Sequence, residues 1–129
     1  MGKIEMGENG VGMPAWLLLN QFGRLVYEAF GEWPYLVGSA TKTTHWRDVD
    51  VRLILEDSEY ERMFGKPSRA GETNPRWRAL CLAFAVLGQK MTGLPIDFQI
   101  QSQTKANELY NGPRWSLILC AETVSKAGG

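Results

Sequence analysis

The chain is poor in cysteine and has no excess of charge of either sign. Its only two cysteines, Cys81 and Cys120, each lie in an apolar run (LCLAF and LILCA). That setting is typical of reduced core thiols rather than of a secreted disulfide framework, and it favours the cytosol. Fourteen Lys and Arg residues balance fourteen Asp and Glu residues, so the net charge supplies no long-range attraction to nucleic acid or to an anionic membrane. Any anion that binds must be held by local contacts.

Long apolar runs, internal repeats and low-complexity tracts are also missing. No run approaches the length of a membrane span, and the opening residues MGKIEMGENGVG lack the apolar core of a secretory signal. With 129 residues, 44% of them hydrophobic, the chain can bury one core and is too short for two. We expect one domain over residues 1–129, with 1–12 and 125–129 flexible, no membrane partner and a cytoplasmic location.

Two amphipathic segments predict the main helices. The first runs from Pro14 to Gly31, with its apolar stripe at Leu18, Phe22, Leu25 and Ala29. The second begins at the Asn74-Pro75 pair, a good cap and first turn, and its stripe is formed by Trp77, Leu80, Phe84, Leu87 and Met91. Leu82 and Val86 lie off that stripe, so this helix is expected to meet a second helix or a partner chain as well.

Short apolar runs predict the strands of a small sheet. YLVGS, VDVRLIL and IDFQIQ read as three strands, WSLILCA is a candidate fourth, and a short helix comes before it. The polar segment EDSEYERMFGKPSRAGETN, with its Gly and Pro residues, predicts a long surface loop. The order of elements indicates an α/β (α+β) fold in which helices pack on a small mixed β-sheet.

Three aspartates lie in or next to predicted strands whose other residues are mostly apolar. Alternation along VDVRLIL places Asp48, Asp50, Arg52 and Ile54 on one face and four apolar residues on the other. Along IDFQIQ, Asp97 stands on the face opposite Ile96, Phe98 and Ile100. Strands are depleted in Asp, so three in two strands call for an explanation. Coincidental surface acids are the simpler alternative to a functional site.

A divalent cation is the explanation we favour. Carboxylates held about 4–6 Å apart repel each other and raise one pKa strongly unless a cation lies between them. Sites built from oxygen ligands suit Mg²⁺ or Mn²⁺, which complete their shells with water and substrate phosphates. Gly38-Ser39 follows the first strand, where a glycine lets a phosphate approach the backbone and a serine hydroxyl can donate to it. Metal ions beside a phosphate site are the arrangement used in phosphoryl and nucleotidyl transfer.

Together these residues resemble a known family. Gly38-Ser39, a spacer, Asp48-Val49-Asp50 at the head of an apolar strand, and Asp97 in a later strand are similar to the signature of the polymerase-beta-like nucleotidyltransferase superfamily, over residues 33–101. The resemblance implies a minimal nucleotidyltransferase domain. By it, Asp48, Asp50 and Asp97 are catalytic metal ligands, with Asp97 also assisting the attacking hydroxyl, and Gly38 and Ser39 hold the phosphates of a nucleoside triphosphate.

The surroundings of this signature leave several roles open. Lys42 and Arg52 are candidates to face the triphosphate, and Arg52, on the acidic face, is also a candidate salt-bridge partner. No second domain for an acceptor is evident, so the acceptor is a small molecule, a protein or RNA, and a homodimer or a partner protein is one way to complete the cleft. We expect transfer of a nucleoside monophosphate to a hydroxyl-type acceptor. The alternatives are a non-catalytic nucleotide-binding regulator or partner subunit, and a metal-dependent phosphohydrolase.

Overall fold

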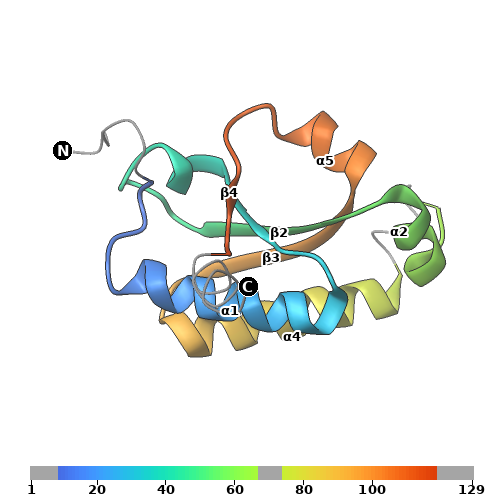
Figure 1. Ribbon diagram of the computed structural model, residues 1–129, viewed down its shortest axis with the longest axis horizontal. Helices are drawn as coiled ribbons and strands as arrows, with labels where there is room; N and C mark the ends of the chain where they lie inside the picture. Colours follow the sequence, from blue (N-terminus) through green and yellow to red (C-terminus); the bar gives the residue numbers. More distant parts are fainter. Residues whose placement is uncertain (1–8, 67–73, 119–129) are drawn as a thin grey trace, which may run out of the picture.

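The computed structural model describes residues 9–66 and 74–118, and Figure 1 shows how its helices lie on the sheet. In chain order the elements are α1 (Ala15–Phe30), β1 (Tyr35–Val37), the short 3-10 helix η1 (Gly38–Thr41), β2 (Val49–Leu55), α2 (Asp57–Phe64), α4 (Pro75–Thr92), β3 (Ile96–Ser102), α5 (Gln103–Leu109) and β4 (Trp115–Ser116). The fold class predicted from the sequence is confirmed, because the described residues form a small mixed α+β domain.

The sheet has the strand order β3-β2-β1-β4, with β3 at one edge of the described sheet. Strand β2 pairs parallel to β3 and antiparallel to β1, and β1 pairs antiparallel to β4. The three strands expected at YLVGS, VDVRLIL and IDFQIQ are therefore present. The candidate fourth strand is present at Trp115–Ser116, and the rest of WSLILCA, including Cys120, lies mostly outside the described residues.

Helices α1 and α4 pack side by side against one face of the sheet, and α5 lies on the other face (Figure 1). The core between sheet and helices contains the apolar face of β2 and that of β3, in agreement with the alternation in the sequence: Val49, Val51, Leu53, Leu55, Ile96, Phe98 and Ile100 are all at most 4% exposed. Because this face is buried, the polar residues between them must lie on the opposite face of the sheet.

Helix α4 follows the sequence prediction closely. The Asn74 side chain accepts hydrogen bonds from the backbone N–H groups of Arg76 and Trp77, at 2.9 and 3.1 Å, and so caps the helix start. The predicted stripe of five large apolar residues packs against the core, and Cys81 is buried there as well. Leu82 and Val86 are 67% and 48% exposed, so no described element covers the second apolar side of this helix.

Two predictions about local structure are wrong. Residues 57–64 of the expected surface loop form α2, whose Tyr60 and Phe64 are 5% and 6% exposed in the core. Their i, i+4 spacing was hard to recognise in a polar segment whose only other apolar residue packed on the core is Met63. The buried stripe of α1 is also rotated from the predicted one. It runs through Leu19, Phe22 and Val26, whereas Leu25 is 38% exposed, because the helix is apolar around most of its circumference.

The first described residues of the chain, which belong to the segment 1–12 expected to be flexible, contact the rest of the domain. Val11 is 5% exposed and belongs to the core. The Gly10 N–H donates to the Ala40 carbonyl at 2.6 Å, and Trp46 Nε1 donates to the Gly10 carbonyl at 2.9 Å. These contacts tie residues 9–12 to the η1 region. Residues 1–8 and 125–129 lie outside the described residues.

Candidate active site

Strand register brings the predicted motifs to one place on the sheet. The antiparallel pairing sets Val37, the last residue of β1, opposite Asp50, and the parallel pairing sets Asp97 opposite Asp50 on the other side. The chain leaves β1 at Gly38, so the Gly38-Ser39 turn begins beside Asp50. Asp48 comes directly before β2. Motifs separated by more than fifty residues therefore meet because of the way three short strands are aligned.

Gly38 is required at its position for two reasons. Its φ of +78° is a left-handed conformation that other residues adopt at a cost. A Cβ atom there would also lie 2.4 Å from Oδ2 of Asp50, which is far inside contact distance. The glycine thus lets the backbone of η1 touch the Asp50 carboxylate. Because Thr41 Oγ1 donates to the Gly38 carbonyl at 2.6 Å, the turn is held by its own side chain.

The three carboxylates influence one another electrostatically. Partial burial raises the pKa of Asp50 above its ordinary value, and the charges of Asp97 and Asp48 act in the same direction. Arg52 opposes these effects. The Asp50 side chain is 23% exposed and that of Asp97 is 43% exposed, so both can be reached from solvent. An acidic cluster of this kind favours an incoming cation, since a cation relieves the mutual repulsion.

Arg52 lies beside the cluster, on the same face of the sheet, and acts as an internal counter-charge. Its guanidinium is 4% exposed, with Nη2 at 3.4 Å from Oδ2 of Asp97 and 3.8 Å from Oδ1 of Asp50. Nη1 donates to the Asp97 carbonyl at 2.7 Å, and Nη2 donates to the Tyr110 hydroxyl at 3.1 Å. Buried charges persist when they are paired and hydrogen-bonded in this way. Arg52 therefore has the salt-bridge role anticipated for it, and its burial suits holding carboxylates better than meeting a triphosphate.

Tyr110 is a site residue that the sequence analysis missed. Its ring centroid lies 5.6 Å from the Arg52 guanidinium carbon, in addition to the hydrogen bond. The residue follows α5 by one position and reaches the acidic cluster only because α5 folds back over the sheet. No local pattern in the sequence marks it, since a tyrosine before Asn-Gly-Pro is an ordinary loop residue.

A cavity of about 240 Å³ lies beside the cluster. One wall is formed by Gly38, Ser39, Thr41 and Lys42, and the other by residues 109–113. Ser39 and Lys42 are exposed, and the Lys42 Nζ atom stands 3.6 Å from where a Cβ of Gly112 would be. A hydroxyl and an ammonium group thus face a space next to Asp50, which is suitable for a phosphate group. The cavity is smaller than pockets that enclose a whole drug-sized ligand, so it accommodates part of a nucleotide.

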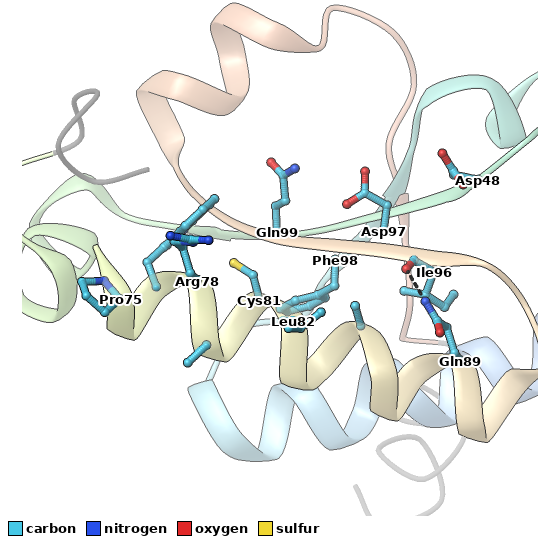
Figure 2. Close-up of a pocket in the computed structure, with 13 residues that line it drawn as sticks. Asp48, Pro75, Arg78, Cys81, Leu82, Gln89, Ile96, Asp97, Phe98 and Gln99 are labelled. Carbon is cyan, nitrogen blue, oxygen red and sulfur yellow. Dashed lines mark hydrogen bonds between the residues drawn. The ribbon is translucent and has the colours of Figure 1, made fainter. Parts of the chain in front are cut away.

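A second, larger space opens on the other side of the carboxylates. This groove, of about 740 Å³, runs between β3 and α4 and includes Asp48 and Asp97 in its lining. Figure 2 shows that Asp48, Asp97 and Gln99 project from the face of the sheet away from α4, whereas Arg78, Cys81 and Leu82 rise from α4 below. Asp48 and Asp97 therefore border the groove, whereas Asp50 adjoins the small cavity through Gly38, which lines that cavity.

The cluster offers the donor chemistry of a magnesium site without a preformed cage. In residues 9–66 and 74–118, no three His, Cys, Asp or Glu side chains are arranged so that they could hold a metal ion by themselves. Mg²⁺ in phosphate-handling sites is commonly bound through one or two carboxylates together with substrate phosphates. Asp48 and Asp50 fit that mode, because Asp50 adjoins the Gly38 turn that lines the small cavity and the substrate would supply the remaining oxygens.

No protein-family model, no curated protein and no solved structure matches the chain. Within the part of the chain that the structure covers, no helix has both the length and the apolar character needed to cross a membrane. The geometry of the described residues is accordingly what supports the functional proposal.

Proposed function

We propose that this protein is a metal-dependent nucleotidyltransferase that moves a nucleoside monophosphate from a nucleoside triphosphate to a hydroxyl-type acceptor, as the polymerase-beta-like signature implies. One observation carries the proposal. The register of β1, β2 and β3 places the Gly38 turn against Asp50 and sets Asp97 opposite it. Gly38 also lines a cavity together with Ser39 and Lys42, so this cavity lies next to Asp50. We further propose a cytoplasmic location, consistent with the buried thiol of Cys81.

The residues divide the work according to where they stand. Ser39 donates a hydrogen bond to the triphosphate, and Lys42 contributes positive charge. Gly38 has no side chain between the backbone and Asp50, so the phosphates can approach Asp50 there. Asp48 and Asp50 would hold Mg²⁺ or Mn²⁺, and the ion would supply Lewis-acid stabilisation of the charge that develops at the α-phosphate. Asp97, whose side chain is more exposed than that of Asp50, accepts the proton of the attacking hydroxyl.

Arg52 and Tyr110 position these groups through hydrogen bonds. The guanidinium contacts both the main-chain carbonyl and the carboxylate of Asp97, so it fixes the direction of that side chain. Tyr110 in turn holds the guanidinium while also lining the small cavity. We assign Arg52 to positioning the carboxylates rather than to contacting phosphate.

One observation favours a second candidate function. Arg52 already offers its positive charge to Asp50 and Asp97, and the described residues have no ready-made metal cage. A nucleotide-binding regulator, or a partner subunit that does not turn over nucleotide by itself, would have these properties. Such a protein would bind nucleotide at the same cavity and release no product.

Turnover separates the candidates. Each ribonucleoside triphosphate, labelled at the α-phosphate, is incubated with the protein, Mg²⁺ and a mixture of sugars, hydroxyl-containing peptides and an oligoribonucleotide. The transferase releases pyrophosphate and labels an acceptor, and Asp50→Asn abolishes both, whereas the control Glu32→Gln, on an exposed residue outside the site, changes neither. Release of inorganic phosphate would indicate a hydrolase instead. Nucleotide binding without any product would favour the regulator.

A further inference from the structure

The groove between β3 and α4 lies along an open edge of the described sheet. Strand β3 has a partner on one side only, because β2 pairs with it and no described strand follows it in the sheet order. Exposed edges offer unpaired N–H and C=O groups that another extended chain can join. Figure 2 views this edge with the groove in front of it.

The register shows which backbone groups point into the groove. Val49 donates to the Pro95 carbonyl at 2.9 Å, so the odd-numbered positions of this segment face β2 and Ile96, Phe98 and Ile100 face outward. Trp77 Nε1 donates to the Ile100 carbonyl at 2.8 Å. Gln89 Nε2 donates to the Ile96 carbonyl at 3.2 Å. The Ile96 N–H also donates to the Leu94 carbonyl at 2.9 Å. Among the described residues, no side chain is hydrogen-bonded to the backbone of Phe98, so a chain that joins this edge would exchange its backbone hydrogen bonds with Phe98.

The two faces of this edge differ in chemistry. Asp97 and Gln99 project on the upper side (Figure 2). On the lower side α4 presents Leu82, which is 67% exposed, and the small residue Ala85. A strand added here would alternate its side chains between these two environments. Its residue opposite Asp97 would lie about 4.5–5.5 Å from it, measured between Cβ atoms, and the neighbours of that residue would pack toward Leu82.

Charge argues against nucleic acid as the occupant. The lining contains a single cation, Arg78, together with the acidic Asp48 and Asp97, whereas nucleic-acid grooves carry several Lys and Arg residues for the phosphates. The groove is also continuous with the proposed site, because the same two aspartates line it. A molecule bound in the groove therefore lies next to Asp97.

We propose that the acceptor is an extended polypeptide segment that pairs with the β3 edge and presents a serine or threonine hydroxyl to Asp97, with apolar residues on either side of the hydroxyl residue. This inference rests on the proposed function. It assigns the small cavity to the nucleotide and the groove to the acceptor, so that the two substrates approach the carboxylates from different sides.

The reaction that follows balances in a single displacement. The hydroxyl oxygen of the peptide forms a bond to the α-phosphorus of the nucleoside triphosphate, and the bond from that phosphorus to the oxygen bridging the β-phosphate breaks. Pyrophosphate leaves with the electron pair of the broken bond. The hydroxyl proton passes to the Asp97 carboxylate and from there to solvent. The product is a phosphodiester between the peptide side chain and the nucleoside.

Synthetic nonapeptides test the proposal directly. One pool has serine at the centre, apolar residues on both sides of it and random residues elsewhere. A second pool has aspartate or glycine at the two flanking positions, a third has alanine in place of serine, and a fourth carries an N-methyl group on the residue after serine, which blocks strand pairing. Transfer of the labelled α-phosphate is measured for each pool with Mg²⁺ and each ribonucleoside triphosphate.

We expect labelling of the first pool only. Leu82→Glu should raise the KM for the labelled peptides roughly tenfold, since it removes a surface that buries apolar side chains. Val86→Glu is the matched control, because Val86 is 48% exposed on the same helix and does not line the groove. Neither substitution should change binding of the magnesium nucleotide.

The outcomes separate this proposal from the one on which it rests. Equal labelling of all serine pools, or labelling of a sugar or RNA in place of peptide, overturns the peptide-edge assignment while the transferase survives. Equal effects of Leu82→Glu and Val86→Glu on peptide KM also overturn it. Absence of magnesium-nucleotide binding in the unaltered protein overturns the proposed function itself.

Discussion

Replacing Gly38 with alanine separates the two tasks that this glycine performs. The left-handed backbone at φ +78° costs an alanine about 1–2 kcal/mol. The new Cβ would also stand 2.4 Å from Oδ2 of Asp50, whereas the Cγ and Cβ atoms of Asp50 lie at 3.4 and 3.6 Å. Only Oδ2 of Asp50 must move, and rotation about χ2 of Asp can move it because the preferred χ2 values of Asp cover a broad range. Turning the carboxylate therefore relieves the clash with less than about 1 kcal/mol of added cost.

Gly31→Ala provides the matched control. Gly31 has a φ of +81°, and a Cβ there would meet nothing within 4 Å. Both variants should lose about 1–2 kcal/mol in the free energy of unfolding by urea titration, which corresponds to about 3–6 °C in Tm per kcal/mol for a domain of this size. Only Gly38→Ala should weaken magnesium-nucleotide binding, by about 10–100-fold, the range observed when partners that orient metal ligands are altered.

Two results would refute this reasoning. If Gly38→Ala binds magnesium nucleotide as tightly as Gly31→Ala does, the orientation of Asp50 does not matter for binding. If Gly38→Ala is several kcal/mol less stable than Gly31→Ala, the carboxylate is locked in place and cannot turn, contrary to the argument from the three distances.

Three further predictions concern stability and reactivity. Asp57 accepts hydrogen bonds from the backbone N–H and the hydroxyl of Thr104, and these lower its pKa below the ordinary 3.8. The stabilisation is therefore present above pH 3.8 and is lost as the pH falls through the lowered pKa. Asp57→Asn should reduce stability at pH 7, and the difference should shrink as the pH is lowered below 3.8 in urea titrations at each pH. Burial raises the pKa of Cys81 from 9.0 to about 11. Alkylation of Cys81 by iodoacetamide at pH 8, followed by peptide mass mapping, should therefore be about 100-fold slower in the native protein than in urea. Equal alkylation rates would contradict the burial of this thiol. A Cβ at Gly23 would stand 2.5 Å from Cβ of Leu117, so Gly23→Ala should cost about 1–3 kcal/mol by overpacking. An unchanged unfolding midpoint would show that Leu117 does not pack against Gly23 of α1.

Period-two alternation was the most reliable signal in the sequence. It assigned the buried face of β2 correctly and, with it, the polar face that carries Asp50 and Arg52. The reason is physical, since a slip of one residue would expose an entire apolar face. The same argument identified Asp97 in β3. The gathering of the aspartates was therefore open to prediction once the strands were aligned.

Helical periodicity was less informative where apolar residues are abundant. In α1 the sequence WLLLNQFGRLVYEAF offers more than one apolar stripe, and only packing against the sheet selects Leu19, Phe22 and Val26. In α2 the opposite holds, because three apolar residues, Tyr60, Met63 and Phe64, in a short polar segment gave too weak a pattern for a helix. Tertiary contacts decided both cases.

The part of the site formed by long-range folding could not be predicted at all. Tyr110 reaches Arg52 from 58 residues away along the chain, and the groove exists only because β3 is an edge strand beside α4. Neither fact has a local signature. Sequence reasoning located the charged groups. The structure showed that Arg52 is buried beside Asp50 and Asp97. It also showed that Asp48 and Asp97 line a groove, whereas the Gly38 turn next to Asp50 lines a separate small cavity.

Calorimetric titration with the four ribonucleoside triphosphates tests the central claim most directly. Each nucleotide is added in Mg²⁺ and in chelator to the unaltered protein and to Asp50→Asn, with Mg²⁺ alone as a further titration. The account predicts that at least one nucleotide binds only with Mg²⁺, that Mg²⁺ alone binds weakly because the carboxylates form no complete cage, and that Asp50→Asn loses the nucleotide binding while remaining folded. Nucleotide binding that persists in chelator or in Asp50→Asn, or no binding of any of the four, would contradict it.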